Sequence, residues 1–283
     1  MNIPMKDWRF LGCTADYAEA KAVLFGAPFD GTVSYRPGAR FAPQAMRSES
    51  YGIETYSPYR GACLEDALVS DIGDIDIPIG NTAQSLQYIG ELTDRILSGG
   101  KKPLMMGGEH LVTLPAVRAV WEKHADLAVI HFDAHTDLRE EYLGERLSHS
   151  AVMRRIHEFL GGGAIWQFGI RSGTKEEYDW ARAGHTALNE FTLDAVPALP
   201  KMLGERPVYL TVDLDVLDPS VFPGTGTPEA GGISFRELVE ALGALSGLNI
   251  VAADIVELAP NYDPSGVSTA VACKVLREIA LLL

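Results

Sequence analysis

The chain has 283 residues, 47% of them hydrophobic, and a formal net charge of −14 at pH 7. This length fits one large α/β domain or two small ones. The negative charge argues against nucleic acid as a partner, because proteins that bind nucleic acid normally carry a basic surface.

Three cysteines with no CxxC spacing argue against a disulfide framework and favour a reducing compartment. No apolar run approaches the roughly 20 residues of a membrane-spanning helix. Residues 1–10 show no signal-peptide pattern. We therefore expect a cytoplasmic protein with no membrane partner.

Apolar, β-rich runs alternate with helix-like segments along the whole chain. The expected strands are 22–28, 68–75, 103–108, 127–135, 164–171, 207–216 and 249–258. The expected helices are 85–100, 113–124, 149–163, 234–247 and 265–283. Strands that are almost continuously apolar are typical of a parallel sheet covered by helices on both faces. The pattern predicts an α/β fold, and the absence of a linker or repeat predicts one domain over residues 1–283.

Polar motifs follow four of these strands. GGEH ends the strand at 103–108, DAHTD the strand at 127–135 and DLD the strand at 207–216, while Glu257 lies near the end of the strand at 249–258. Ligands of open α/β sheets bind at the carboxyl ends of the strands. We therefore expect these acids and imidazoles to meet at one edge of the sheet.

Six side chains in these motifs are candidate metal ligands, and we call them the His–Asp cluster: His110, Asp133, His135, Asp137, Asp213 and Asp215. The alternate spacing predicts that Asp133, His135 and Asp137 lie on one side of an extended segment. Four buried carboxylates are costly unless cations compensate them. Six ligands suit two metals, and Asp and His without Cys suit Mn²⁺ better than Co²⁺, Ni²⁺, Fe²⁺ or Zn²⁺.

Other polar residues near these motifs have simpler interpretations. We expect His131 to be hydrogen-bonded in the core or to support a ligand. We expect Asp218 and Asp254 to have structural roles, in turns or in hydrogen bonds.

GGEH, DAHTD and DLDVLDPSVFPGTGTPEAGG resemble the three signature motifs of the ureohydrolase family, which includes arginases and agmatinases. The likeness extends from about Gly26 to the last helix. PFDGTVSYRPGARFAPQAMR (28–47) looks like the bacterial agmatinase branch, as does PGTGTP, where arginases more often have Ala in place of Gly224. The resemblance implies an arginase-like three-layer α/β/α fold with a mainly parallel sheet, two Mn²⁺ per chain, and a trimer or hexamer.

The resemblance also implies a role for each motif residue. One Mn²⁺ would be held by His110, Asp133, Asp137 and Asp213, and the other by His135, Asp133, Asp213 and Asp215. His149 matches the family histidine that shuttles protons, and Glu257 matches the glutamate that anchors the guanidinium group. A metal-bridging hydroxide would attack the guanidinium carbon, with Asp137 helping to move its proton.

Among guanidines, the sequence favours agmatine, which would give putrescine and urea. The loop 138–148 has three Glu and no Asn or Thr, and Ser172 stands where arginases have an Asp. Both departures weaken an arginine assignment. The acidic loop also suits the ammonium of agmatine better than it would suit the carboxylate of arginine. Arginine, 4-guanidinobutyrate and other ω-guanidino compounds stay open, and Arg139 or Arg146 could contact the carboxylate of guanidinobutyrate.

Two other classes of function are alternatives to a ureohydrolase. A non-catalytic metal- or polyamine-binding protein would keep the fold and the metals without releasing urea. A single-zinc deacetylase on a similar fold is disfavoured, because six ligands exceed what one open catalytic metal uses.

Overall fold

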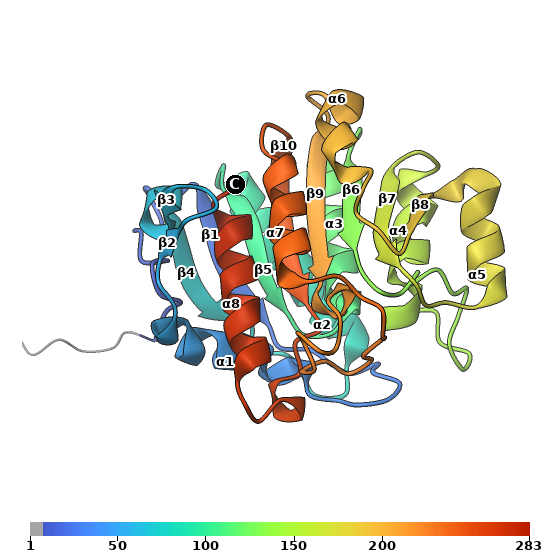
Figure 1. Ribbon diagram of the computed structural model, residues 1–283, viewed down its shortest axis with the longest axis horizontal. Helices are drawn as coiled ribbons and strands as arrows, with labels where there is room; N and C mark the ends of the chain where they lie inside the picture. Colours follow the sequence, from blue (N-terminus) through green and yellow to red (C-terminus); the bar gives the residue numbers. More distant parts are fainter. Residues whose placement is uncertain (1–7) are drawn as a thin grey trace, which may run out of the picture.

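A computed structural model describes residues 8–283 of the chain. The first seven residues, which are part of the segment where we expect no signal peptide, lie outside the described residues. An eight-stranded sheet forms the centre of the molecule, in the order β4-β1-β5-β10-β9-β6-β7-β8 (Figure 1). Every pairing within this sheet is parallel.

The helices and strands alternate as the sequence predicts. The strands of the large sheet are β1 (Ala22–Ala27), β4 (Val69–Asp74), β5 (Lys102–Gly107), β6 (Ala128–Phe132), β7 (Ile165–Ile170), β8 (Ala187–Glu190), β9 (Pro207–Asp213) and β10 (Asn249–Val256). The helices are α1 (Ala42–Glu49), α2 (Thr82–Ser98), α3 (Thr113–Lys123), α4 (Val152–Leu160), α5 (Lys175–Trp180), α6 (Leu199–Leu203), α7 (Phe235–Ala244) and α8 (Val267–Ala280). A small antiparallel pair joins β2 (Tyr56–Ser57) and β3 (Ala62–Cys63).

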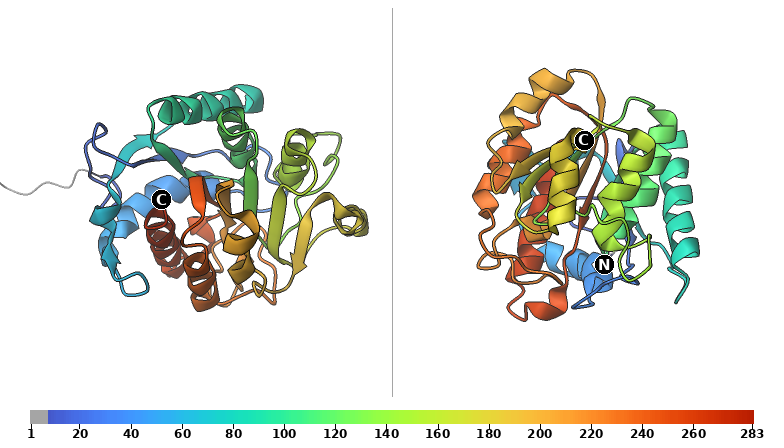
Figure 2. Two further views of the ribbon diagram at one scale, coloured as in Figure 1. Left: turned by 90° about the horizontal axis from the view of Figure 1, so that it is seen from above. Right: turned by 90° about the vertical axis from the view of Figure 1, so that its right-hand side faces the viewer.

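The helices form one layer on each face of the sheet. Helices α2, α3 and α4 pack together on one face, and α1, α7 and α8 on the other, as the two turned views in Figure 2 show. Each face buries its own apolar core against the sheet. Because both faces are covered, the inner strands β1, β6 and β9 are buried along almost their whole length. The predicted three-layer α/β/α fold with a parallel sheet is confirmed.

All seven expected strands and all five expected helices are present among the described residues. The sequence interpretation missed β8, the β2–β3 pair and the three helices α1, α5 and α6. Strand β8 lies at the edge of the sheet and is largely half-buried, so it lacks the continuous apolar run of the central strands. Among residues 8–283, no helix has both the length and the apolar character needed to cross a bilayer.

Candidate active site

Four neighbouring strands carry the predicted site residues to one edge of the sheet. Strand β5 leads to His110, β10 to Glu257 and β6 to Asp133, while β9 ends at Asp213. A cavity of about 240 Å³ opens at this edge. Five of the six residues of the His–Asp cluster line the cavity, and the sixth, Asp133, is fully buried. The expected meeting of these motifs is therefore observed.

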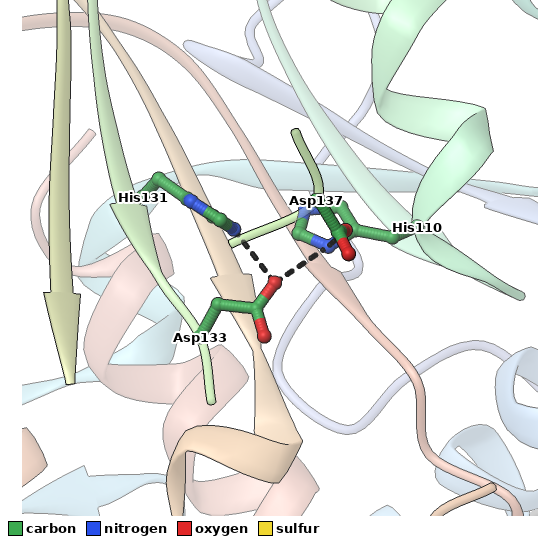
Figure 3. A group of neighbouring side chains, drawn as sticks. All are labelled: His110, His131, Asp133 and Asp137. Carbon is green, nitrogen blue, oxygen red and sulfur yellow. Dashed lines mark hydrogen bonds and ion pairs between the residues drawn. The ribbon is translucent and has the colours of Figure 1, made fainter. Parts of the chain in front are cut away.

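The imidazole of His110 lies at the centre of three carboxylates. Its Nδ1 atom is 3.1 Å from Asp133 Oδ2, 3.1 Å from Asp137 Oδ2 and 3.2 Å from Asp213 Oδ2. Figure 3 shows His110 meeting Asp133 and Asp137, which come from another segment of the chain. These four residues are the set that the family resemblance assigns to one metal.

A second group forms around His135. Its Nδ1 atom lies 2.9 Å from Asp215 Oδ2 and 3.4 Å from Asp133 Oδ1. Asp133 therefore uses one oxygen toward each histidine, as a bridging ligand would. Asp213 is fixed beside this group, because its Oδ1 accepts a hydrogen bond of 2.9 Å from the amide of Asp215.

His131 supports Asp133 from the fully buried end of the cluster. Gln167 Nε2 lies 3.1 Å from His131 Nδ1, and because Gln167 Nε2 can only donate, His131 Nδ1 accepts. The proton of the neutral ring is then on Nε2, which donates to Asp133 Oδ2 at 2.7 Å. A nitrogen that carries a proton cannot bind a metal. The expected supporting role of His131 is therefore the one that its contacts favour.

The backbone at the site differs from the extended geometry that we expected. Strand β6 ends at Phe132, and Asp137 has a left-handed φ of 53°, so the chain turns before Asp137 reaches His110. Asp215 lies in a short 3-10 turn after β9 rather than in a strand. The prediction of one extended segment was wrong for Asp137, and the expected strand at 207–216 ends before Asp215. Glu257 also has a left-handed φ, 66°, and such backbones in non-glycine residues gather at functional sites.

A helix cap holds the turn that carries Asp137. Glu177 closes the capping box of α5 with Thr174, and its Oε1 also accepts hydrogen bonds from Thr136 Oγ1 at 2.7 Å and from the Leu138 amide at 3.0 Å. One buried carboxylate therefore fixes both neighbours of Asp137. Nothing in the sequence around DAHTD points to Glu177, because the contact spans about 40 residues.

Burial and mutual repulsion drive the pKa values of the cluster apart. Burial and the nearby Asp215 and Asp133 carboxylates raise the pKa of Asp213 well above its usual range. Burial would also raise the pKa of Asp133, but neighbouring histidines, with His131 first, hold it well below its usual range. Burial would lower the pKa of His110, but the three surrounding carboxylates raise it well above the usual value. Perturbed groups of this kind are typical of functional sites.

The donor set fits divalent cations. His110 Nδ1 is buried and has no hydrogen-bond partner of acceptable geometry, although three carboxylates surround it. His110 Nε2 lies 3.0 Å from Thr211 Oγ1, and with the proton on Nε2 the Nδ1 lone pair faces the carboxylate oxygens. Within residues 8–283, the ion-pair partners of the four cluster carboxylates are all histidines. Cations between these atoms would remove the repulsion, and the ligand types suit Mn²⁺ and related metals.

His149 and Glu257 face the same cavity as the cluster. His149 begins the short turn before α4, where its Nε2 lies 3.2 Å from Ser34 Oγ. Burial lowers the pKa of His149 to about 4, although a hydrogen bond to the Thr32 backbone opposes this effect. Glu257 is buried, and its Oε1 accepts a hydrogen bond of 2.8 Å from the His110 amide. The structure therefore brings both predicted residues to the His–Asp cluster.

The glutamates of the loop 138–148 are not at the cavity. Glu140 pairs with three arginines, Arg146, Arg154 and Arg155, and neither Glu141 nor Glu145 lines the cavity. Arg146 is also absent from the lining, whereas Arg139 is part of it. The expectation that the acidic loop favours a substrate ammonium therefore has no support in the geometry.

Sequence reasoning missed part of the cavity wall. Ser34 and Tyr142 line the cavity, and Thr32 contacts His149 from outside the lining. Thr32 and Ser34 belong to the segment 28–47, whose resemblance to agmatinases was the available signal. Asp218 and Asp254 have structural contacts, as expected. Asp218 closes a turn with the amides of residues 220, 231 and 232, and Asp254 accepts hydrogen bonds from Thr113 and Tyr209.

The chain matches the model of the arginase family over residues 20–282. It is 48% identical to an agmatinase of Bacillus subtilis over 96% of this chain and 95% of that protein. It is 34% identical to a guanidinobutyrase of Pseudomonas aeruginosa, with 93% and 86% covered. A solved Clostridium difficile structure, provisionally described as an agmatinase, superposes with a TM-score of 0.93 at 53% identity, covering 94% of this chain and 98% of that one.

The chain therefore belongs to the arginase family. Within that family it is an agmatinase-type ureohydrolase, an enzyme that hydrolyses a C–N bond of a linear guanidine.

Proposed function

We propose that the protein hydrolyses agmatine to putrescine and urea with two Mn²⁺ bound at the His–Asp cluster. The observation that carries this proposal is the convergence of four carboxylates and two imidazoles on one cavity that His149 and Glu257 also line. In the reaction, water adds to the guanidinium carbon, and the bond from that carbon to the alkyl nitrogen breaks.

The cluster would divide between the two cations as the family resemblance implies. The contacts around each histidine agree with this division, and Asp213 adjoins the second set through its hydrogen bond with the Asp215 amide. His110, Asp133, Asp137 and Asp213 would hold one cation, and His135, Asp133, Asp213 and Asp215 the other. Two bound divalent cations would lower the pKa of a water molecule and so supply the strong nucleophile that a resonance-stabilised guanidinium needs.

Glu257 would bind the guanidinium group of the substrate. Its carboxylate is buried at the cavity, and burial together with the neighbouring Glu109 raises its pKa well above the usual range. A guanidinium cation beside it would compensate the buried charge through a charge-assisted pair. Glu257 would thereby orient the substrate carbon toward the cluster.

Asp137 and His149 would move the protons. Asp137 would accept a hydrogen bond from the attacking water, because its carboxylate both faces the cavity and lies beside His110. His149 presents Nε2 as the atom that can take a proton and pass it to the leaving amine. Proton transfer by such a group typically contributes about 10²- to 10⁴-fold in rate.

Urea release tests this proposal directly. Manganese-loaded protein is assayed with agmatine, arginine and 4-guanidinobutyrate at equal concentration, alongside a His149→Ala variant. We expect agmatine to be preferred and the variant to lose about 10²- to 10⁴-fold in kcat while keeping its metals. Preference for another guanidine would keep the proposed chemistry and make that compound the substrate. No urea from any of the three, with two metals bound per chain, would favour the metal- or polyamine-binding alternative.

A second substrate, 4-guanidinobutyrate, is favoured by one observation. Arg139 lines the cavity, where its Nε lies 3.6 Å from Glu177 Oε2 and its guanidinium 5.1 Å from the centre of the Tyr142 ring. Among the described residues, the ion pair of Arg139 with Glu177 is long and uses Nε, so the terminal nitrogens of Arg139 can still contact a substrate carboxylate. The similarity to a guanidinobutyrase agrees with this candidate.

An Arg139→Gln variant separates the two substrates. If guanidinobutyrate binds Arg139, its kcat/KM falls about 10-fold or more in the variant, as a lost charge-assisted contact predicts. If agmatine is the substrate, its kcat/KM stays level or rises, because a like charge near the ammonium is removed. An Arg146→Gln variant serves as the control, since Arg146 pairs with Glu158 outside the cavity.

We infer assembly and location from the family resemblance. A trimer or hexamer in the cytoplasm is the expectation, with a small cationic guanidine as the partner and no nucleic acid. Sedimentation of the purified protein gives the number of subunits, and a monomer would contradict the assembly.

A further inference from the structure

The side chain of Glu109, which precedes His110 in the chain, is fully buried and is not part of the cavity lining. Its two oxygens contact Thr32 instead. The Thr32 amide donates to Glu109 Oε2 at 3.0 Å, and the Thr32 hydroxyl donates to Oε1. Glu109 therefore uses both oxygens to hold one residue that lies 77 positions earlier in the chain.

Thr32 in turn holds His149 at two points. The His149 amide donates to Thr32 Oγ1 at 3.1 Å, and His149 Nδ1 lies 2.9 Å from the Thr32 carbonyl oxygen. A carbonyl oxygen can only accept, so Nδ1 carries the proton of the neutral ring. The lone pair is then on Nε2, which is the nitrogen that proton transfer requires.

The Thr32 hydroxyl takes part in both contacts, as a donor to Glu109 and as an acceptor from His149. Because this hydroxyl donates its single proton to Glu109, its oxygen is free to accept from the His149 amide. The segment around Thr32 has no regular secondary structure, so the side-chain contacts of Glu109 help to fix it. Gly108 allows its close approach, since a Cβ at that position would overlap the Phe29 carbonyl.

We propose that Glu109 is a positioning residue for His149 and acts through Thr32. Two adjacent residues of GGEH then do different work: His110 faces the cation site, while Glu109 fixes the orientation and tautomer of the proton-transfer histidine. The inference rests on the proposed function, because it assumes that His149 transfers a proton. It goes beyond that function by giving the buried acid of GGEH a task outside metal binding.

Steady-state kinetics of the manganese-loaded protein with agmatine test this arrangement. We expect Glu109→Gln and Thr32→Val each to lower kcat by about 10- to 100-fold, because a poorly oriented ring transfers the proton less often. KM and the two bound Mn²⁺ should be retained. Thr32→Ser, which keeps the hydroxyl, is the matched control and should recover most of the loss seen in Thr32→Val.

A double-mutant cycle decides whether Glu109 acts through His149. If it does, Glu109→Gln combined with His149→Ala is no slower than His149→Ala alone, within about twofold. Multiplying losses would overturn the inference, as would a rise in KM with kcat intact, which would mean that Glu109 acts on Glu257 instead. If Glu109→Gln does not fold, Thr32→Val combined with His149→Ala tests the same chain of contacts.

A crystal structure of manganese-loaded Glu109→Gln gives a readout that needs no activity. Separation of His149 Nδ1 from the Thr32 carbonyl, beyond the present 2.9 Å, supports the inference. An unmoved ring overturns it. If no guanidine is hydrolysed by the parent protein, the proposed function fails on its own, and this structure still decides whether Glu109 positions His149.

Discussion

Two of the regions where the molecule buries charged side chains compensate that charge differently. At the amino-terminal edge, Arg47 contacts Asp71 through Nε at 2.7 Å and Nη2 at 2.9 Å, and it also pairs with Asp74. At the carboxyl ends of the central strands, the four carboxylates of the His–Asp cluster have histidines as ion-pair partners within residues 8–283.

This difference indicates which buried carboxylates need a cation that the chain does not supply. Arg47 provides a permanent charge and a planar fork of donors, so Asp71 is compensated by the chain itself. The cluster has more negative groups than its imidazoles can neutralise, and each imidazole nitrogen that binds a metal must be unprotonated. Four carboxylates buried together without an arginine or lysine therefore favour cations from outside the chain, whereas Asp71 with its arginine is a structural pair.

Asp133→Ala should produce the largest effect, because Asp133 contacts the imidazoles of both His110 and His135. We expect metal affinity to fall by more than about 100-fold, and urea release by about 10³-fold or more. Metal content after desalting and urea release measure the two losses. Asp71→Asn is the matched control, a buried aspartate outside the cluster, and should keep both metals. Two tightly bound Mn²⁺ in Asp133→Ala would contradict the bridging role.

Arg47→Met should lower the free energy of unfolding without affecting the metals. Removing Arg47 leaves Asp71 buried and unpaired, which costs about 3 to 5 kcal/mol. Urea denaturation followed by circular dichroism measures the change. Arg236→Met removes an exposed pair with Glu240 and should change stability little. Equal effects of the two substitutions would show that the buried pair contributes no more to the free energy of unfolding than the exposed pair.

Removing the metals should destabilise the parent protein but not the variant that cannot bind them. At Mn²⁺ about 100-fold above the dissociation constant, binding adds about 3 kcal/mol to the free energy of unfolding. Thermal unfolding with Mn²⁺ or with a chelator measures this shift. Arg47→Met should show the same shift as the parent, and Asp133→Ala a much smaller one. A chelator that leaves the parent unchanged would contradict a cation-dependent cluster.

His149→Asn should produce the smallest effect, on the pH dependence of stability. Burial lowers the pKa of His149 to about 4, below the ordinary value of 6.5, so the unfolded chain binds more protons between these values. The contribution of His149 is fully present above pH 6.5 and is lost as the pH falls toward 4. We expect the variant to lose about 1 to 2 kcal/mol less than the parent between pH 7 and pH 4.5.

Urea denaturation of metal-free protein across this pH range measures that difference. His124→Asn, at the end of α3 and outside the cavity lining, is the control. Parallel pH profiles of the parent and His149→Asn would contradict a lowered pKa of the His149 imidazole.

The central strands and the members of the cluster could be predicted from sequence, and each for a physical reason. A strand buried on both faces is continuously apolar, so β1, β5, β6, β9 and β10 are visible as runs. Acids directly after such runs are also visible, because they interrupt an apolar stretch of sequence. Strand β8 was missed, because this short edge strand is largely half-buried and carries no such run.

The sequence by itself determined the fold class, the edge of the sheet that carries the site and the residue types available there, because apolar periodicity and motif spacing are local properties. Only the tertiary structure decided that Asp137 reaches His110 through a left-handed turn, that Glu140 is bound by arginines outside the cavity, and that Glu109 holds His149 through Thr32. These contacts join residues far apart in the chain, and no local pattern records which side chains packing brings together.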